Sequence, residues 1–212
     1  MVRTGARAQA LAALLVEAGL PVTDVRPPAP RLETLPSQLQ SDVLDLYRSL
    51  GGRLDRPVLR PGAWDLALAG GDVVELDEEL HFNRYRARTL DGTWSRRLPW
   101  RDAYLTLCQT EEPACLSAGS WGKRWTNSSC EAMFGTPGPA GDMGAPGGAP
   151  RWKQRALYDA IKDAYAAGST GPRLVRLAVY DDLGGTPLGV VLQGGARPAP
   201  EVLRELVSRR TA

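Results

Sequence analysis

The chain has 212 residues, of which 43% are apolar and 24% are charged, and its formal net charge is +2. This length and composition are those of a soluble globular protein with a substantial core, and so small a charge does not by itself indicate a nucleic-acid partner. No apolar run approaches the roughly 18 to 20 residues that cross a bilayer, so we expect no membrane partner.

The N-terminal quarter predicts two helices joined by a proline-rich connector. Residues 5–19 have the pattern of an amphipathic helix rather than of a signal peptide. Five prolines between residues 21 and 36 indicate the connector, and a second helix is predicted over residues 38–50. We therefore expect residues 1–36 to form a separate N-terminal segment and residues 37–212 the main domain.

The middle of the chain predicts strands followed by a helix. The strands are expected at residues 57–59, 64–69 and 73–81. Gly70, Gly71 and Asp72 give a tight hairpin turn between the second and the third. A helix is expected over residues 100–108.

Residues 109–149 are rich in glycine and proline and predict a long, loop-like insertion. After it, a helix is expected from Pro150 to Gly168, strands at 173–180 and 188–192, and a closing helix at 201–209. This order of elements predicts an α/β fold with a mixed sheet flanked by helices.

Acidic residues gather on the strand at 73–81. Alternation places Glu75, Asp77 and Glu79 on one face, and Asp65 lies across the hairpin turn. Carboxylates this close repel one another, and a divalent cation with oxygen ligands relieves the repulsion. The alternative is an edge strand whose acids face water.

Basic and aromatic residues follow at once. Six arginines and one acid between His81 and Arg101 give this stretch a formal charge of +5. Acidic residues beside arginines suit the cleavage of a nucleic acid, because the acids bind a metal ion and the arginines bind phosphates. The alternative is an arginine-rich, solvated face that pairs with the acidic strand.

Three further cations, Arg151, Lys153 and Arg155, fall at the start of the helix predicted from Pro150. The helix dipole is positive at that end, so an anion would offset their cost. The alternative is that they pair with surface acids.

The order Asp65, a short turn, Val73-Val-Glu75-Leu-Asp77 and then His81 resembles the PD-(D/E)XK nuclease superfamily, especially the branch related to very-short-patch-repair endonucleases. The resemblance covers residues 38–90, and residues 150–195 by element order. It implies a restriction-endonuclease-like α/β core.

In that resemblance, Asp65 and Glu75 bind Mg²⁺ or Mn²⁺, Asp77 is a third ligand or orients water, and His81 shuttles a proton or contacts a phosphate. Asp77 stands where the superfamily usually has a lysine, so Lys153 is the candidate substitute.

The sequence therefore predicts a metal-dependent endonuclease, a magnesium-dependent deoxyribonuclease that hydrolyses DNA phosphodiester bonds. The residues expected to contact nucleic acid are Arg84, Arg86, Arg88, Arg151 and Arg155. The alternative is a non-catalytic nucleic-acid-binding or protein-interaction module on the same fold, and a homodimer is left open.

Three cysteines, without a CxxC pair, favour a reducing cytoplasm over a disulfide scaffold. The bias toward alanine, glycine, proline and arginine suggests a bacterial source. Cys108, Cys115 and Cys130 are expected to be buried free thiols, or Cys115 and Cys130 to form a local clip. Zinc binding is the weaker interpretation.

Overall fold

The computed structural model describes residues 5–120, 122–168 and 171–212. The chain divides into two compact units, each assembled from separate segments. Unit 1 comprises residues 1–29, 63–78 and 169–212, and unit 2 comprises residues 30–62 and 79–168. The boundary predicted at residue 37 lies inside unit 2.

Unit 1 contains a four-stranded sheet in the order β1-β2-β3-β4. The strands are β1 (Val22–Thr23), β2 (Leu66–Leu68), β3 (Val73–Asp77) and β4 (Leu174–Ala178). β2 is antiparallel to both β1 and β3, whereas β3 and β4 are parallel. The protein is thus α/β with a mixed sheet flanked by helices, as the order of the predicted elements indicated.

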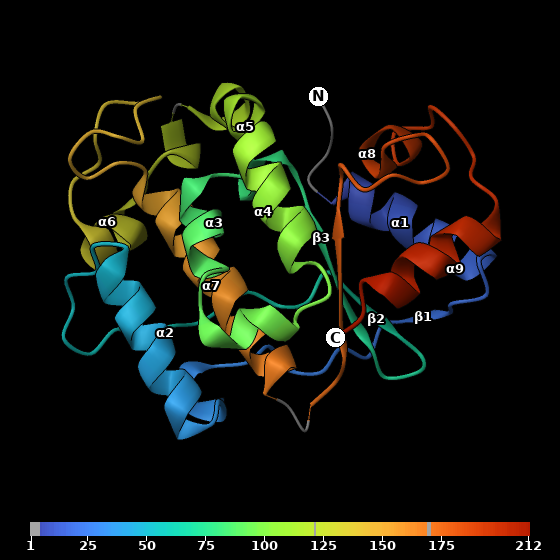
Figure 1. Ribbon diagram of the computed structural model, residues 1–212, viewed down its shortest axis with the longest axis horizontal. Coiled ribbons are helices and arrows are strands. Elements are labelled where there is room, and N and C mark those ends of the chain that lie inside the picture. Colours follow the sequence, from blue (N-terminus) through green and yellow to red (C-terminus); the bar gives the residue numbers. More distant parts are fainter. Residues whose placement is uncertain (1–4, 121, 169–170) are drawn as a thin grey trace. The chain divides into compact units, whose positions relative to one another are not determined.

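Three helices of unit 1 lie on one side of its sheet (Figure 1). They are α1 (Ala6–Glu17), α8 (Leu188–Val191) and α9 (Pro200–Arg209). Alternate strand residues, such as Val74 and Leu177, form one core with apolar residues of these helices. The prediction of a strand at 188–192 is wrong, because Leu188–Val191 form the helix α8. A short apolar run does not distinguish a buried strand from a buried helix.

The hairpin between β2 and β3 forms as predicted, and Leu68 N donates a hydrogen bond to Asp72 O (2.8 Å) across the turn. The third predicted strand is too long, because β3 ends at Asp77 and Glu79–His81 form a short 3-10 helix, η2. Glu79 therefore does not continue the strand alternation of Glu75 and Asp77.

Unit 2 is helical. Its α-helices are α2 (Ser37–Ser49), α3 (Arg84–Thr89), α4 (Arg101–Thr110), α5 (Glu112–Gly119), α6 (Ser128–Phe134) and α7 (Pro150–Ala167). Its other 3-10 helices are η1 (Leu32–Thr34), η3 (Thr93–Arg97) and η4 (Gly122–Arg124). The helix α7 packs against α2, α3 and α6. In the part of the chain that the structure describes, no helix is long and apolar enough to cross a membrane.

Two predictions for unit 2 are wrong. The strand expected at 57–59 has no regular secondary structure. The stretch expected to be a loop-like insertion, 109–149, instead contains α5, η4 and α6. Proline in the first turn favours the start of α5, and the Asn127 side chain caps α6 by accepting a hydrogen bond from Cys130 N (3.1 Å).

Candidate functional site

The acidic face of β3 is neutralised in part by an arginine of the neighbouring strand. Glu75 and Asp77 share a face, as predicted, and Arg176 on β4 stands opposite Glu75 in the parallel register. Arg176 Nη1 donates to both carboxylate oxygens of Asp77, at 2.9 and 2.7 Å. Both side chains are almost completely buried. The charge of Asp77, one of the acids that suggested a cation, is therefore balanced within unit 1 by a guanidinium.

Asp65 has a local structural role. Its Oδ2 accepts a hydrogen bond from Leu76 N at 2.8 Å. Because β2 begins only at Leu66, the carboxylate extends the hydrogen bonding between the two strands by one position. Within the described ranges, Asp65, Glu75 and Asp77 do not form a group of three side chains that could share one metal ion. These three carboxylates, as arranged here, do not fit the metal centre that the resemblance implies.

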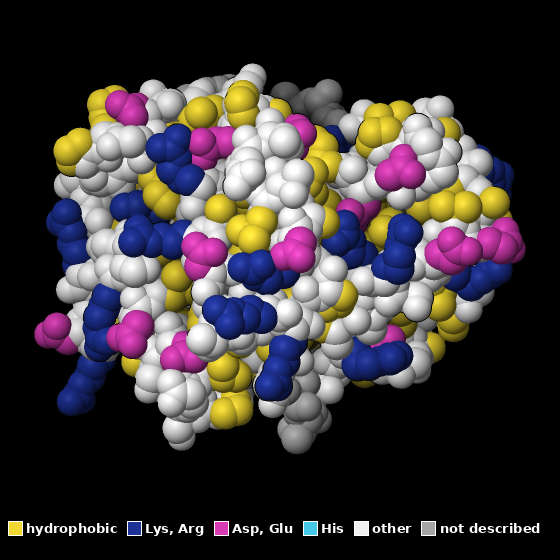
Figure 2. All heavy atoms as spheres, viewed as in Figure 1, with side chains coloured by type: hydrophobic (Ala, Val, Ile, Leu, Met, Phe, Trp, Pro, Cys, Tyr) yellow, Lys and Arg dark blue, Asp and Glu magenta, His cyan; other side chains and the backbone are white. Residues whose placement is uncertain are grey.

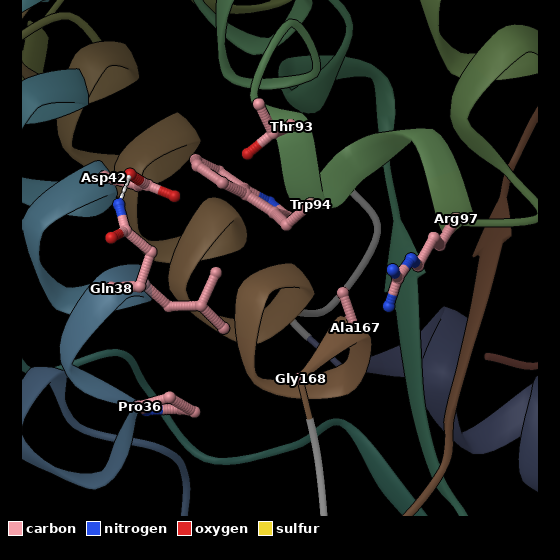
Figure 3. A pocket seen from close by; sticks show the side chains of 9 residues that line it. Pro36, Gln38, Asp42, Thr93, Trp94, Arg97, Ala167 and Gly168 are labelled. Atoms are coloured by element: carbon pink, nitrogen blue, oxygen red, sulfur yellow. Dashed lines mark hydrogen bonds between the residues drawn. The ribbon is translucent and has the colours of Figure 1, made fainter.

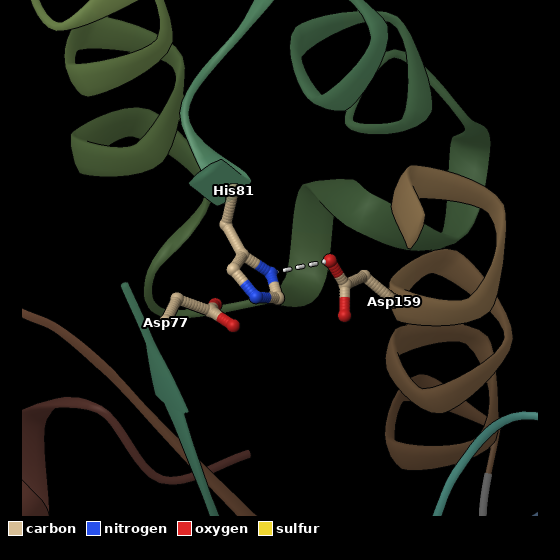
Figure 4. A group of neighbouring side chains, drawn as sticks. All are labelled: Asp77, His81 and Asp159. Atoms are coloured by element: carbon tan, nitrogen blue, oxygen red, sulfur yellow. Dashed lines mark hydrogen bonds and ion pairs between the residues drawn. The ribbon is translucent and has the colours of Figure 1, made fainter. Parts of the chain in front are cut away.

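His81 lies in η2, and its imidazole points toward Asp159 of α7 (Figure 4). Nδ1 is 2.9 Å from Asp159 Oδ2, and the side chains are 20% and 7% exposed, respectively. A carboxylate in this position orients the ring and makes its other nitrogen a better base or ligand. The sequence predictions missed Asp159. Asp159 could have been found from the sequence, because it follows Trp152 by seven residues and is therefore an acid on the apolar face of the predicted helix.

Two of the five arginines expected to contact nucleic acid are in ion pairs within unit 2. Arg84 binds Glu112, with Nη2 2.8 Å from Oε2. This pair raises the pKa of Arg84, and the same hydrogen bonding to Arg84 lowers the pKa of Glu112. Arg86 is completely buried and lies 2.7 Å from Asp163 of α7. Arg86 is therefore a core residue, inaccessible to a ligand.

The other three expected arginines differ in exposure. Arg88 is exposed on α3, whereas Arg151 and Arg155 are half-buried on α7. Arg151 donates to the Gln154 side chain, and Arg155 donates to Leu80 O at 3.3 Å. Lys and Arg side chains are visible on the surface between α3 and α6, with acidic side chains elsewhere on the same face (Figure 2).

Lys153 lies in the first turn of α7, as predicted, and this turn contains no acidic residue. Partial burial lowers the pKa of Lys153, and the charges of Arg53 and Arg88 lower it further. Arg53, in the loop after α2, was not predicted. Nothing in its local sequence pattern marks it.

A protein-family model matches residues 45–193 of the chain. The chain belongs to the Family of unknown function (DUF7255). No curated protein and no solved structure matches it. The DUF7255 match spans β2, β3, β4 and the whole of α7, and therefore includes Asp77, Arg176, His81, Asp159 and Lys153. It leaves out α1 and α9.

The cysteines of this DUF7255 protein are free, buried thiols, which is one of the two arrangements expected. Burial raises the pKa of Cys115 to about 12, and burial also raises the pKa of Cys130. Neither thiol has the lowered pKa that a nucleophile or a metal ligand needs.

Proposed function

We propose that this protein is a metal-dependent phosphodiesterase acting on DNA, with its reaction centre at His81 and Asp159. The observation that carries the proposal is the 2.9 Å contact between Nδ1 of His81 and the carboxylate of Asp159. The buried acid holds the ring, and the ring is partly exposed. This is the arrangement of an oriented general base, and it equally suits a histidine metal ligand.

His81 and Asp159 offer a nitrogen and an oxygen donor, a chemistry that suits Mn²⁺ better than Mg²⁺, which prefers oxygen ligands alone. A bound ion would polarise a phosphoryl oxygen and lower the pKa of a water molecule. Asp159 would orient the imidazole through Nδ1. The other ring nitrogen of His81 would either hold the ion or accept a proton from the attacking water, because one nitrogen cannot do both.

We also propose, on the resemblance, a restriction-endonuclease-like core built on β2, β3 and β4. Two features support it. Asp65, Glu75 and Asp77 follow one another along the antiparallel pair of β2 and β3, and β4 then pairs with β3 in parallel. The buried free thiols support the cytoplasmic location proposed from the sequence.

The test is cleavage of single-stranded, duplex and branched DNA with Mn²⁺ or Mg²⁺. We expect His81→Gln to lower the rate by about 10²- to 10⁴-fold through loss of the base. We expect Asp159→Asn to lower the rate by about 10- to 100-fold through loss of ring orientation. The matched control is Asp102→Asn, because Asp102 is an exposed acid of unit 2 whose side chain is 91% accessible. A wild-type protein that cuts none of these substrates would rule out the hydrolase.

The second candidate is a non-catalytic nucleic-acid-binding module. The Asp77–Arg176 ion pair favours it, because an acid whose charge is already balanced is a poor metal ligand. This candidate predicts no cleavage with either metal and DNA binding that survives Glu75→Ala. Binding combined with cleavage that depends on His81 would decide against it.

A further inference from the structure

Lys153 lies in the first turn of α7, and the charges of two other cationic side chains of unit 2, Arg53 and Arg88, act on its amine. The Lys153 amine lies 5.6 Å from the centre of the Tyr85 ring and 6.0 Å from that of Phe134. A Cβ atom added to Gly51 would lie 3.6 Å from Nζ, so the chain passes beside the amine. Lys153 is therefore confined between two rings and a loop.

Arg53 is held in place by its own loop. Its guanidinium packs on Gly135, where an added Cβ atom would lie only 2.0 Å from Cζ. The Tyr47 hydroxyl accepts hydrogen bonds from the backbone N–H groups of Arg53 (3.0 Å) and Leu54 (2.9 Å). The same hydroxyl donates to Met133 O at 2.8 Å. The Tyr47 hydroxyl thus fixes the backbone at Arg53 and Leu54 and ties it to Met133.

Arg88 follows Tyr85 by three residues on α3, so it projects on the same side of the helix as the ring beside Lys153. Over residues 5–120, 122–168 and 171–212, the side chains of Arg53, Arg88 and Lys153 form no salt bridge or hydrogen bond. The charges that act on the Lys153 amine are those of the two arginines, and the helix dipole at this end is also positive. A bound anion would relieve this repulsion.

We propose that Arg53, Arg88 and Lys153 form a binding site for one backbone phosphate of a nucleic-acid strand. This inference takes from the proposed function only the class of ligand, and it needs neither metal nor hydrolysis. The rings of Tyr85 and Phe134 are buried, so no base can stack on them, and the contact carries no sequence information. A membrane surface is instead recognised by clusters of lysine and arginine along an exposed segment.

The experiment is fluorescence anisotropy of a labelled oligothymidine in EDTA, where metal-dependent cleavage cannot occur. We expect Lys153→Gln and Arg53→Gln each to weaken binding by about tenfold or more, because each removes a charged hydrogen-bond donor. The double variant should reduce the slope of log K against log salt by about 0.7, the value for one phosphate of a single strand. Lys153→Arg keeps the charge and should keep most of the affinity.

The matched control is Arg97→Gln, which removes one positive charge elsewhere in unit 2. Arg97 is exposed and lines a groove with Trp94, Ala167 and Gly168 (Figure 3). Ala167 is the last residue of α7, about 21 Å along the helix from Lys153 at a rise of 1.5 Å per residue. We expect this variant to bind the oligonucleotide as the wild type does.

Circular dichroism melts show whether each variant folds, and we expect no loss of thermal stability because repulsion between like charges is removed. If Arg53→Gln fails to fold, Arg88→Gln at an exposed position replaces it. The proposal is overturned if the wild type does not bind, if Lys153→Gln and Arg53→Gln bind as tightly as the wild type, or if Arg97→Gln is equally weak. Binding to anionic vesicles without binding to the oligonucleotide would overturn it too. If binding depends on Arg53 and Lys153 but no DNA is cleaved, only the proposed hydrolase activity is contradicted. If DNA is cleaved equally well by the Arg53 and Lys153 variants, only this phosphate site is contradicted.

Discussion

Replacing Arg176 by methionine isolates the role of the buried ion pair in unit 1. The two side chains are 0% and 1% exposed, and one guanidinium nitrogen contacts both oxygens of Asp77 at 2.9 and 2.7 Å. Removal of the arginine leaves a buried carboxylate without this partner, which costs about 3 to 5 kcal/mol of unfolding free energy. That loss is a large part of the roughly 5 to 15 kcal/mol that stabilises a typical domain.

The assay is urea unfolding combined with hydrogen exchange. Loss of the ion pair should speed exchange at the amides of β3 and β4 more than in the helices of unit 2, because opening of the damaged strands becomes easier. The matched control is Arg173→Met. Arg173 also pairs with an acid of unit 1, Asp72, at 2.8 Å, but its side chain is 68% exposed, so we expect a cost below about 1 kcal/mol.

A double variant, Asp77→Leu with Arg176→Met, completes the cycle. It removes both charges, so it should cost less than Arg176→Met alone. If Arg176→Met costs no more than Arg173→Met, the buried pair does not stabilise the sheet and the reasoning is wrong. If Arg176→Met also creates tight Mn²⁺ binding, the carboxylate is a latent metal ligand rather than a purely structural group.

Three further predictions concern single side chains. Asp65→Ala should cost about 1 to 3 kcal/mol in urea unfolding, because it removes the acceptor of Leu76 N, and Asp65→Asn should cost clearly less; equal losses would contradict this. Tyr47→Phe should cost about 1 to 3 kcal/mol, because it removes three hydrogen bonds and leaves Leu54 N without its acceptor, whereas Arg53 N keeps its bond to Met133 O; an unchanged urea midpoint would show that the loop does not depend on this hydroxyl. Cys115, whose pKa is raised from 9.0 to about 12, should be a thiolate in only about one molecule in 10⁴ at pH 8 when folded, against about one in ten when unfolded. Iodoacetamide should therefore label Cys115 in urea and not in the native protein, and equal labelling rates would show that the thiol is accessible and normal.

Local patterns predicted much of the secondary structure. The helices α2, α4, α7 and α9 and the hairpin of β2 and β3 follow from apolar spacing, caps and turn residues that lie within the elements themselves. The helices α5 and α6 also had local signals, Pro113 and the cap residue Asn127. The glycine and proline content of the surrounding residues outweighed those signals and predicted a loop.

Pairing of the arginines could not be predicted in the same way. The sequence showed a run of basic residues after His81, but the partners of Arg84 and Arg86 are acids of α5 and α7, 28 and 77 positions further along the chain. Helix packing decides which arginine meets an acid and which becomes buried. The same packing brings Arg53 beside Lys153, although the two positions share no motif.

The acidic strand β3 separates most clearly what the sequence determines from what the tertiary structure determines. The sequence by itself determined that Glu75 and Asp77 share a face of one strand, because side chains on a strand alternate. Only the tertiary structure decided how their charge is balanced. Arg176 reaches Asp77 from a strand 99 residues away, and the register of a parallel strand pair depends on packing across the whole sheet rather than on the residues beside the acids. Asp77, one of the acids that predict a metal ligand set, is therefore one half of a buried ion pair in the folded chain.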